Sequence, residues 1–105
     1  MSKQKSSLSD KVTSTPDGLK IWHQERVIFE VTERLCELME ERGVNRTELA
    51  DLLGKTKGYI TQILGGNANL TLRSLSDIYL ALGHQFKVDD EPLIAENVPR
   101  IVEMR

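Results

Sequence analysis

The chain contains little cysteine, few aromatic residues and no long apolar segment. Cys36 is the single cysteine among 105 residues, which excludes an intrachain disulfide framework and a multi-cysteine metal site. No stretch approaches the roughly 20 apolar residues that cross a bilayer, and the N-terminal MSKQKSSLSDK lacks the apolar region of a secretion signal. We therefore expect a cytoplasmic protein with no membrane partner.

The charge balance and the two histidines bear on three kinds of function: nucleic-acid binding, metal binding and catalysis. The formal charge of -2 creates no global basic field, so any nucleic-acid-binding face must be local. His23 and His84 are far apart, with no acidic or cysteine residue at metal-ligand spacing beside them. We expect no metal, no cofactor and no catalytic residue, and hence no enzyme.

A Ser- and Lys-rich segment opens the chain and a long helix follows it. Residues 1–18 end in Thr15-Pro16-Asp17-Gly18, a turn signal, and are expected to form a flexible tail. Residues 19–42 contain no proline or glycine, and Gly43 follows them. Apolar residues three and four apart predict one buried helix face made of Ile28, Val31, Leu35, Leu38 and Met39.

The same helix carries a second apolar stripe. At about 100° per residue, Trp22, Phe29 and Cys36 fall roughly a quarter-turn from the first face. A small domain does not need so wide an apolar surface. We expect a partner, for example a second copy, to cover it.

Three shorter helices are predicted next. The first opens at residue 45 or 46 and ends at Gly54, the second covers residues 57–64 after the cap Thr56, and the third covers residues 72–82 after the cap Thr71. The predicted inward residues of the first two helices are Leu49, Leu53, Ile60 and Ile63, and the third helix carries a periodic apolar set of Leu72, Leu75, Ile78, Tyr79 and Leu82. The alternation in residues 84–88, HQFKV, predicts a short strand, whereas residues 89–105 show no clear pattern.

The letters Gly54-Lys55-Thr56 match the end of an ATP phosphate loop. Such a loop needs another glycine five positions before Gly54, but that position is Leu49, and the preceding segment has helical periodicity. A turn between two helices fits better, because Ala50 permits close crossing of the helices and Gly54 can adopt a positive φ. The segment predicts a helix-turn-helix.

Residues 31–83 resemble the lambda-repressor-like or XRE family in the segments ELADLLG, YITQILGG and LTLRSLSDIYLALG. The resemblance implies an all-α domain of four to five helices at residues 19–83, with a helix-turn-helix at 46–65. A long N-terminal helix and a short C-terminal strand complete the expected fold. Two positions depart from the family pattern: Lys55 stands where an aliphatic residue is usual, and Gly58 where a polar one is frequent.

A helix-turn-helix inserts its second helix into the major groove, which assigns roles to individual residues. Lys57, Thr61 and Gln62 are the expected base readers, since their side chains can bond to base edges. Gly58 permits close approach, and Tyr59 offers its hydroxyl to a phosphate. By resemblance, the residue that opens the first helix of the motif contacts a phosphate, and here it is Arg46. Further candidate DNA contacts are Lys55, Thr56, Asn67 and Asn69.

Two functions remain open on the sequence. In the first, a dimeric transcriptional repressor reads a palindromic double-stranded DNA operator, and residues 84–88 pair with their copy in the second subunit. In the second, the chain is the antitoxin of a toxin-antitoxin pair, which binds a toxin protein and autoregulates its operon. The expected dimer or partner contacts are Trp22, Phe29, Phe86 and Val88.

Overall fold

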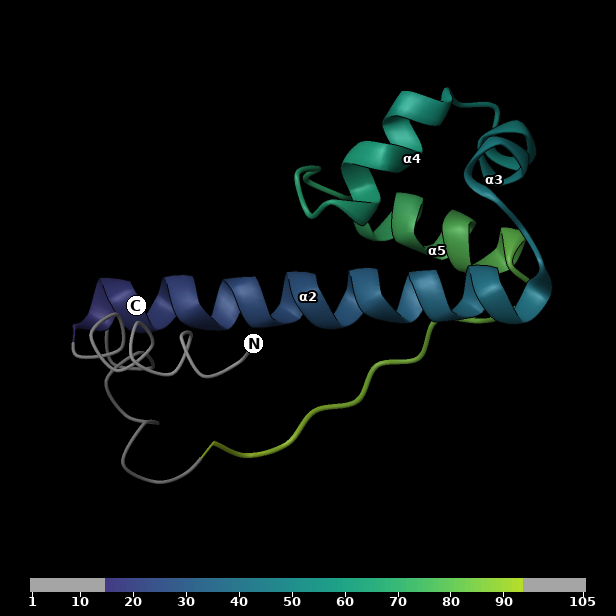
Figure 1. Ribbon diagram of the computed structural model, residues 1–105. Helices are drawn as coiled ribbons and strands as arrows, with labels where there is room; N and C mark the ends of the chain where they lie inside the picture. The colour runs from purple at the N-terminus through teal and green to yellow at the C-terminus, as the bar shows by residue number, and fades with distance from the viewer. Residues whose placement is uncertain (1–14, 94–105) are drawn as a thin grey trace. The chain divides into compact units, whose positions relative to one another are not determined.

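The computed structural model describes residues 15–93, and the secondary structure of that part is entirely helical. It comprises α2 (Pro16–Arg42), α3 (Arg46–Leu53), α4 (Lys57–Leu64) and α5 (Leu72–Ala81) (Figure 1). The expected all-α class is thus confirmed for these residues. Residues 28–88 form one compact unit, and the described residues 15–27 and 89–93 belong to another, so that α2 begins in one unit and ends in the other.

Helix α2 starts three residues before the expected position. The Thr15 hydroxyl accepts a hydrogen bond from Gly18 N at 3.0 Å, and the Thr15 carbonyl accepts one from Leu19 N. Pro16 occupies the first helical position, where its missing N–H costs nothing and its fixed φ suits the helix. Thr15 to Gly18 therefore form the cap and first turn of α2, where the sequence suggested a free-standing turn. The rest of the expected tail, residues 1–14, lies outside the described residues.

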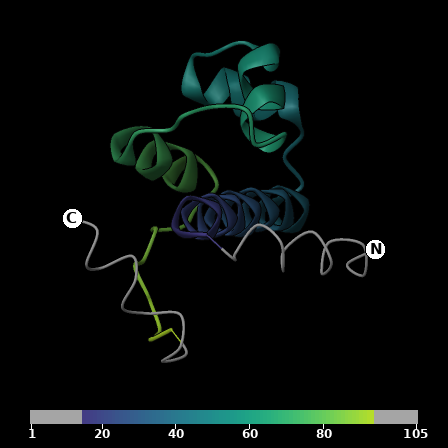
Figure 2. The same cartoon turned by 90° about the vertical axis from the view of Figure 1, so that its left-hand side faces the viewer.

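All four helices contribute to the core of the 28–88 unit. In Figures 1 and 2, the three short helices lie on one side of the C-terminal half of α2. Helix α3 packs against both α4 and α5. No buried residue among those described is polar or charged. The fully or nearly buried core residues are Leu35, Leu38, Met39, Leu49, Ala50, Ile60, Ile63, Leu75, Ile78, Tyr79 and Leu82.

Leu72, the first of the periodic apolar residues expected on α5, does not face inward, and neither does Leu52 of α3, for which no orientation was predicted. The Leu52 residue is 60% exposed and Leu72 is 81% exposed, whereas Leu49 in the same helix as Leu52 is only 1% exposed. Short helices bury a narrower face than their apolar residues cover, because each packs against few neighbours. Ile28 of α2 is half-buried, and the other predicted core positions are buried or packed against the core.

The strand predicted at residues 84–88 does not form in the described part of the chain, so that prediction is wrong. Gly83 turns the chain with a φ of 76°, and His84 N donates to the Tyr79 carbonyl at 2.8 Å. Phe86 then packs edge-on against Tyr79, with ring centroids 5.0 Å apart. The alternation thus reflects one aromatic residue turned toward the core, and a ladder needs a second strand that residues 15–93 do not supply.

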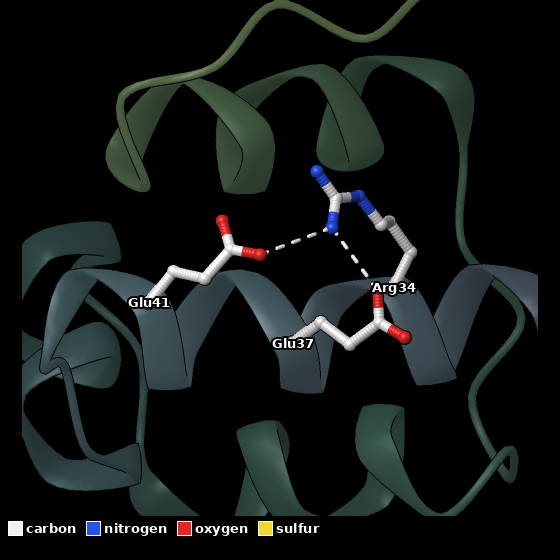
Figure 3. A network of polar contacts seen from close by, with 3 residues as sticks. All are labelled: Arg34, Glu37 and Glu41. Atoms are coloured by element: carbon white, nitrogen blue, oxygen red, sulfur yellow. Dashed lines mark hydrogen bonds and ion pairs between the residues drawn. The ribbon is translucent and has the colours of Figure 1, made fainter.

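The acidic run of α2 lies on its exposed surface. Arg34 reaches along the helix to Glu37 at 3.0 Å and to Glu41 at 3.5 Å (Figure 3). The hydrogen bond that Arg34 donates to the Glu37 carboxylate raises the pKa of Arg34 above its ordinary value. Because all three side chains are well exposed, we expect the network to add little to stability.

Candidate nucleic-acid interface

A three-residue turn, Gly54 to Thr56, joins α3 to α4. Gly54 adopts the left-handed conformation, with φ 68° and ψ 33°, which is costly for any residue with a Cβ. Lys55 N donates to the Ala50 carbonyl at 2.9 Å, so the turn closes on the last turn of α3. Ala50 is buried, and its small side chain lets the helices approach. The predicted roles of Gly54 and Ala50 agree with this geometry.

Side-chain caps fix the first turns of both helices. Asn45 and Glu48 form a reciprocal capping box at α3, with Asn45 N donating to Glu48 Oε1 at 2.9 Å and Glu48 N donating to Asn45 Oδ1 at 2.8 Å. At α4, the Thr56 hydroxyl accepts from Tyr59 N at 3.0 Å, as predicted. Thr56 is thereby occupied as a cap. The reciprocal box at Asn45 was not predicted, although the Asn-x-x-Glu spacing signals it.

Helix α4 has one buried and one exposed face. Ile60 and Ile63 are buried in the core. The opposite face is exposed and consists of Lys57, Gly58, Thr61 and Gln62, with Tyr59 half-buried at its edge. The structure therefore places the predicted base readers together, on the side of α4 away from the core.

Lys55 and Lys57 lie just before and at the start of α4 in a chain that is negative overall, and Asp77 shares a depression with Lys55 and Tyr59. Between Asp51 and Asp77 there is no acidic residue, while Lys55, Lys57 and Arg73 lie in that interval. An acidic surface begins at α3, where a shallow hollow is lined by Gly43, Val44, Glu48, Asp51 and Leu52. This acid-free interval is visible in the sequence alone, where it is a signal for a basic surface that was not among the predictions.

Arg46 and Thr61 bring the start of α3 and the middle of α4 into contact. Arg46 Nη1 lies 3.4 Å from Thr61 Oγ1 and donates a hydrogen bond to it. Both residues are exposed. A residue predicted to contact a phosphate and one predicted to read a base are thus joined directly.

Lys55, the exception to the family pattern, lies against Tyr59. The Lys55 ammonium is 5.3 Å from the centre of the Tyr59 ring, within the range of a cation–π interaction. Both residues line a small surface depression with Leu53, Ser74, Asp77 and Ile78. The lysine therefore lies with its ammonium over Tyr59, and the residue as a whole remains exposed.

Asn67 and Asn69 lie beyond the C-terminal end of α4, away from Lys57 along the helix. Asn67 N donates to the Gln62 carbonyl at 2.9 Å, which helps to end α4 after Gly66 turns with a φ of 76°. The side chains of Asn67 and Asn69 are exposed. The structure thus gives Asn67 a local role in the turn, where its backbone bonds to Gln62 at the opposite end of α4 from Lys57.

The four predicted partner residues lie in different surroundings. Trp22 is half-buried and lies edge-on to His23, with ring centroids 4.9 Å apart and Arg26 over its ring. Phe86 packs against the core, whereas Phe29 is 62% exposed and Val88 is 82% exposed. Phe29 and Val88 are the two that present most of their surface within the 28–88 unit.

Residues 15–93 contain neither a candidate metal cluster nor a membrane-spanning helix. These residues contain no group of three or more His, Cys, Asp or Glu placed to hold a metal ion. None of the helices α2 to α5 combines the length and apolar character needed to span a membrane. Comparison of the chain with protein-family models, curated proteins and solved structures gives no match.

Proposed function

We propose that the protein is a sequence-specific DNA-binding regulator of the lambda-repressor-like type, which reads the major groove with α4. The observation that carries the proposal is the exposed face of α4, where Lys57, Thr61 and Gln62 lie together outside a buried Ile60 and Ile63. Lysine donates to guanine O6 and N7, and glutamine pairs with adenine N6 and N7. A rigid helix that displays such side chains is suited to reading base edges.

Positive charge beside α4 supports the same role. Arg46 at the start of α3 and Lys55 in the turn flank the exposed face, and no acidic residue lies between Asp51 and Asp77. Phosphates dominate the affinity of such complexes, whereas base contacts determine their specificity. Arg46 and Lys55 are therefore the proposed phosphate contacts.

A protein partner is a second element of the proposal. Phe29 and Val88 are large apolar residues that remain mostly exposed. Their exposure favours contact with a second copy or with another protein. A second copy gives a dimeric repressor on a palindromic operator, whereas a different protein gives an antitoxin bound to its toxin. Sedimentation of the purified chain at micromolar concentration distinguishes them: a homodimer favours the repressor, and a stable monomer favours the antitoxin.

Equilibrium binding to duplex DNA tests the proposed function. The full chain is incubated with a pool of random duplexes, and the enriched sequence is compared with a scrambled duplex of equal composition over a range of salt concentrations. We expect tighter binding to the enriched sequence, with an affinity that falls steeply as salt rises. Equal affinity for both duplexes, or no binding to either at low salt, would contradict the proposal.

A further inference from the structure

The hydroxyl of Thr61 is bonded differently from that of Thr32, another threonine inside a helix. Threonine in a helix interior often donates its proton to a carbonyl of the preceding turn. Thr32 in α2 does so, because its Oγ1 lies 3.2 Å from the Phe29 carbonyl. Thr61 makes no such bond, and its oxygen instead accepts from Arg46 Nη1 at 3.4 Å.

This difference determines which hydrogen-bonding group Thr61 presents to the outside. A hydroxyl has one proton and two lone pairs. The guanidinium of Arg46 has only donors, so it occupies lone-pair capacity and leaves the Thr61 proton unused. Because Thr61 is exposed on α4, that proton is available to a group approaching from outside.

Gly58 leaves the approach to Thr61 open. Side chains three residues apart on a helix are neighbours, and each leans toward the N-terminal end of the helix. Residue 58 precedes Thr61 by three positions and has no side chain. The Cβ of a residue in place of Gly58 would meet only Thr56 Oγ1, at 3.8 Å, so nothing within the protein fills this space.

We propose that Arg46 is a positioning residue that holds Thr61 as a hydrogen-bond donor, so that one position of the DNA site must present an acceptor to Thr61. This inference rests on the proposed function, and it specifies the chemistry of the base. In the major groove guanine, adenine and thymine each offer an acceptor, whereas cytosine offers only the N4 donor. Cytosine on the strand that faces Thr61 is therefore disfavoured at this position.

The inference assigns Arg46 two roles. Its charge lies near the backbone, which favours every sequence equally, while one of its donors orients Thr61, which affects a single base position. A residue that contacted phosphate alone would affect the affinity without affecting base preference. Base preference at one position is therefore the measurement that separates the two roles.

The test compares base preferences of the full chain and three variants, by selection from random duplexes followed by titration of the four bases at each enriched position. The variants are Thr61→Val, which keeps the shape and loses the hydroxyl, Thr61→Ser, which keeps the hydroxyl, and Arg46→Ala. Thermal unfolding of each variant checks that it is folded. For the wild type we expect one position at which cytosine is about fivefold weaker than the best base, the size of one ordinary hydrogen bond.

The variants should change that position in a set pattern. Thr61→Val should abolish the discrimination against cytosine there and nowhere else, and Thr61→Ser should keep it. Arg46→Ala should weaken binding to all sequences and also reduce the discrimination at the same position. Unchanged discrimination in Arg46→Ala, or in Thr61→Val, would overturn the inference.

The outcome for the wild-type chain separates this inference from the proposed function. If the wild type enriches no sequence, the proposed function fails and the inference fails with it. If the wild type enriches a site but cytosine is tolerated at every position, only the inference fails.

Discussion

The ammonium of Lys55 lies 5.3 Å from the centre of the Tyr59 ring, on the turn that joins α3 to α4. The position is one where the lambda-repressor-like pattern prefers an aliphatic residue, and here a charged group lies over an aromatic ring instead. Packing and charge are thus combined in one side chain. The relationship explains how the turn tolerates a lysine.

A substitution that keeps the stem and removes the charge separates these two contributions. We expect Lys55→Met to change the free energy of unfolding by less than about 1 kcal/mol, because an exposed cation–π contact contributes about that much at most. Its DNA affinity should fall, with the slope of log K against log salt reduced by about one. Urea unfolding and salt titrations measure the two effects. An unchanged salt slope would show that Lys55 does not contact a phosphate.

Two glycines of the same motif should respond in opposite ways to alanine. Gly58 is within α4 with open space around it, so Gly58→Ala should stabilise the fold by roughly 0.5–1 kcal/mol. Gly54 has a φ of 68°, so Gly54→Ala should destabilise it by about 1–2 kcal/mol. Denaturant unfolding measures both.

The DNA affinity of Gly58→Ala tests how closely the duplex approaches α4. We expect Gly58→Ala to bind DNA more weakly although it is more stable, because its new methyl group lies where the duplex approaches α4. A stability gain with undiminished affinity would show that the duplex does not approach Gly58 closely.

Leu49 and Leu52 provide a matched pair for the core. Both lie in α3, but Leu49 is 1% exposed and Leu52 is 60% exposed. Leu49→Ala should cost about 2–5 kcal/mol through lost burial and the cavity left behind, whereas Leu52→Ala should remain within about 0.5 kcal/mol of the wild type. Similar losses for the two variants would contradict the orientation of α3.

The stability of the fold should fall in alkaline solution through Tyr79. Burial raises the pKa of Tyr79 above its ordinary value, and the charge of Arg34 offsets part of this effect. The folded state therefore holds the phenolic proton more tightly, so the contribution to stability is complete below pH of about 10 and is lost as pH rises through the raised pKa.

Unfolding by urea at increasing pH checks this linkage against Tyr79→Phe, which has no proton to lose. We expect the wild type to lose more stability than Tyr79→Phe as pH rises above about 10. Parallel decreases in both proteins would show that Tyr79 does not account for the alkaline loss.

Much of the helical pattern follows from local signals in the sequence. Thr56 and Gly54 carry strong local preferences, and the helix between Lys57 and Leu64 was predicted with its observed bounds. Thr15-Pro16 carries an equally local signal, a cap followed by proline at the first helical position, but the following glycine favoured a turn instead. The local signal at Thr15-Pro16 thus specified a helix start, and the prediction of a turn at this place was wrong.

Features that depend on distant segments were less predictable. The alternation of residues 84–88 suggests a strand, but whether a ladder forms depends on a partner strand and not on the segment itself. Helical periodicity does not reveal how few neighbours α5 has, so Leu72 was grouped with the buried residues of its helix although it is exposed. The hydrogen bond from Arg46 to Thr61 joins residues fifteen positions apart, and it required the packing of α3 on α4 to become visible.

The central claim is that the exposed face of α4 reads DNA sequence, and Gln62 tests it most directly because the residue is exposed and is not part of the core. The measurement is the base preference of wild type and Gln62→Ala, each selected against the same pool of random duplexes at one salt concentration. We predict that Gln62→Ala keeps the salt dependence of the wild type but loses its preference at one or two adjacent positions. Identical enriched sequences for the two proteins would contradict the claim.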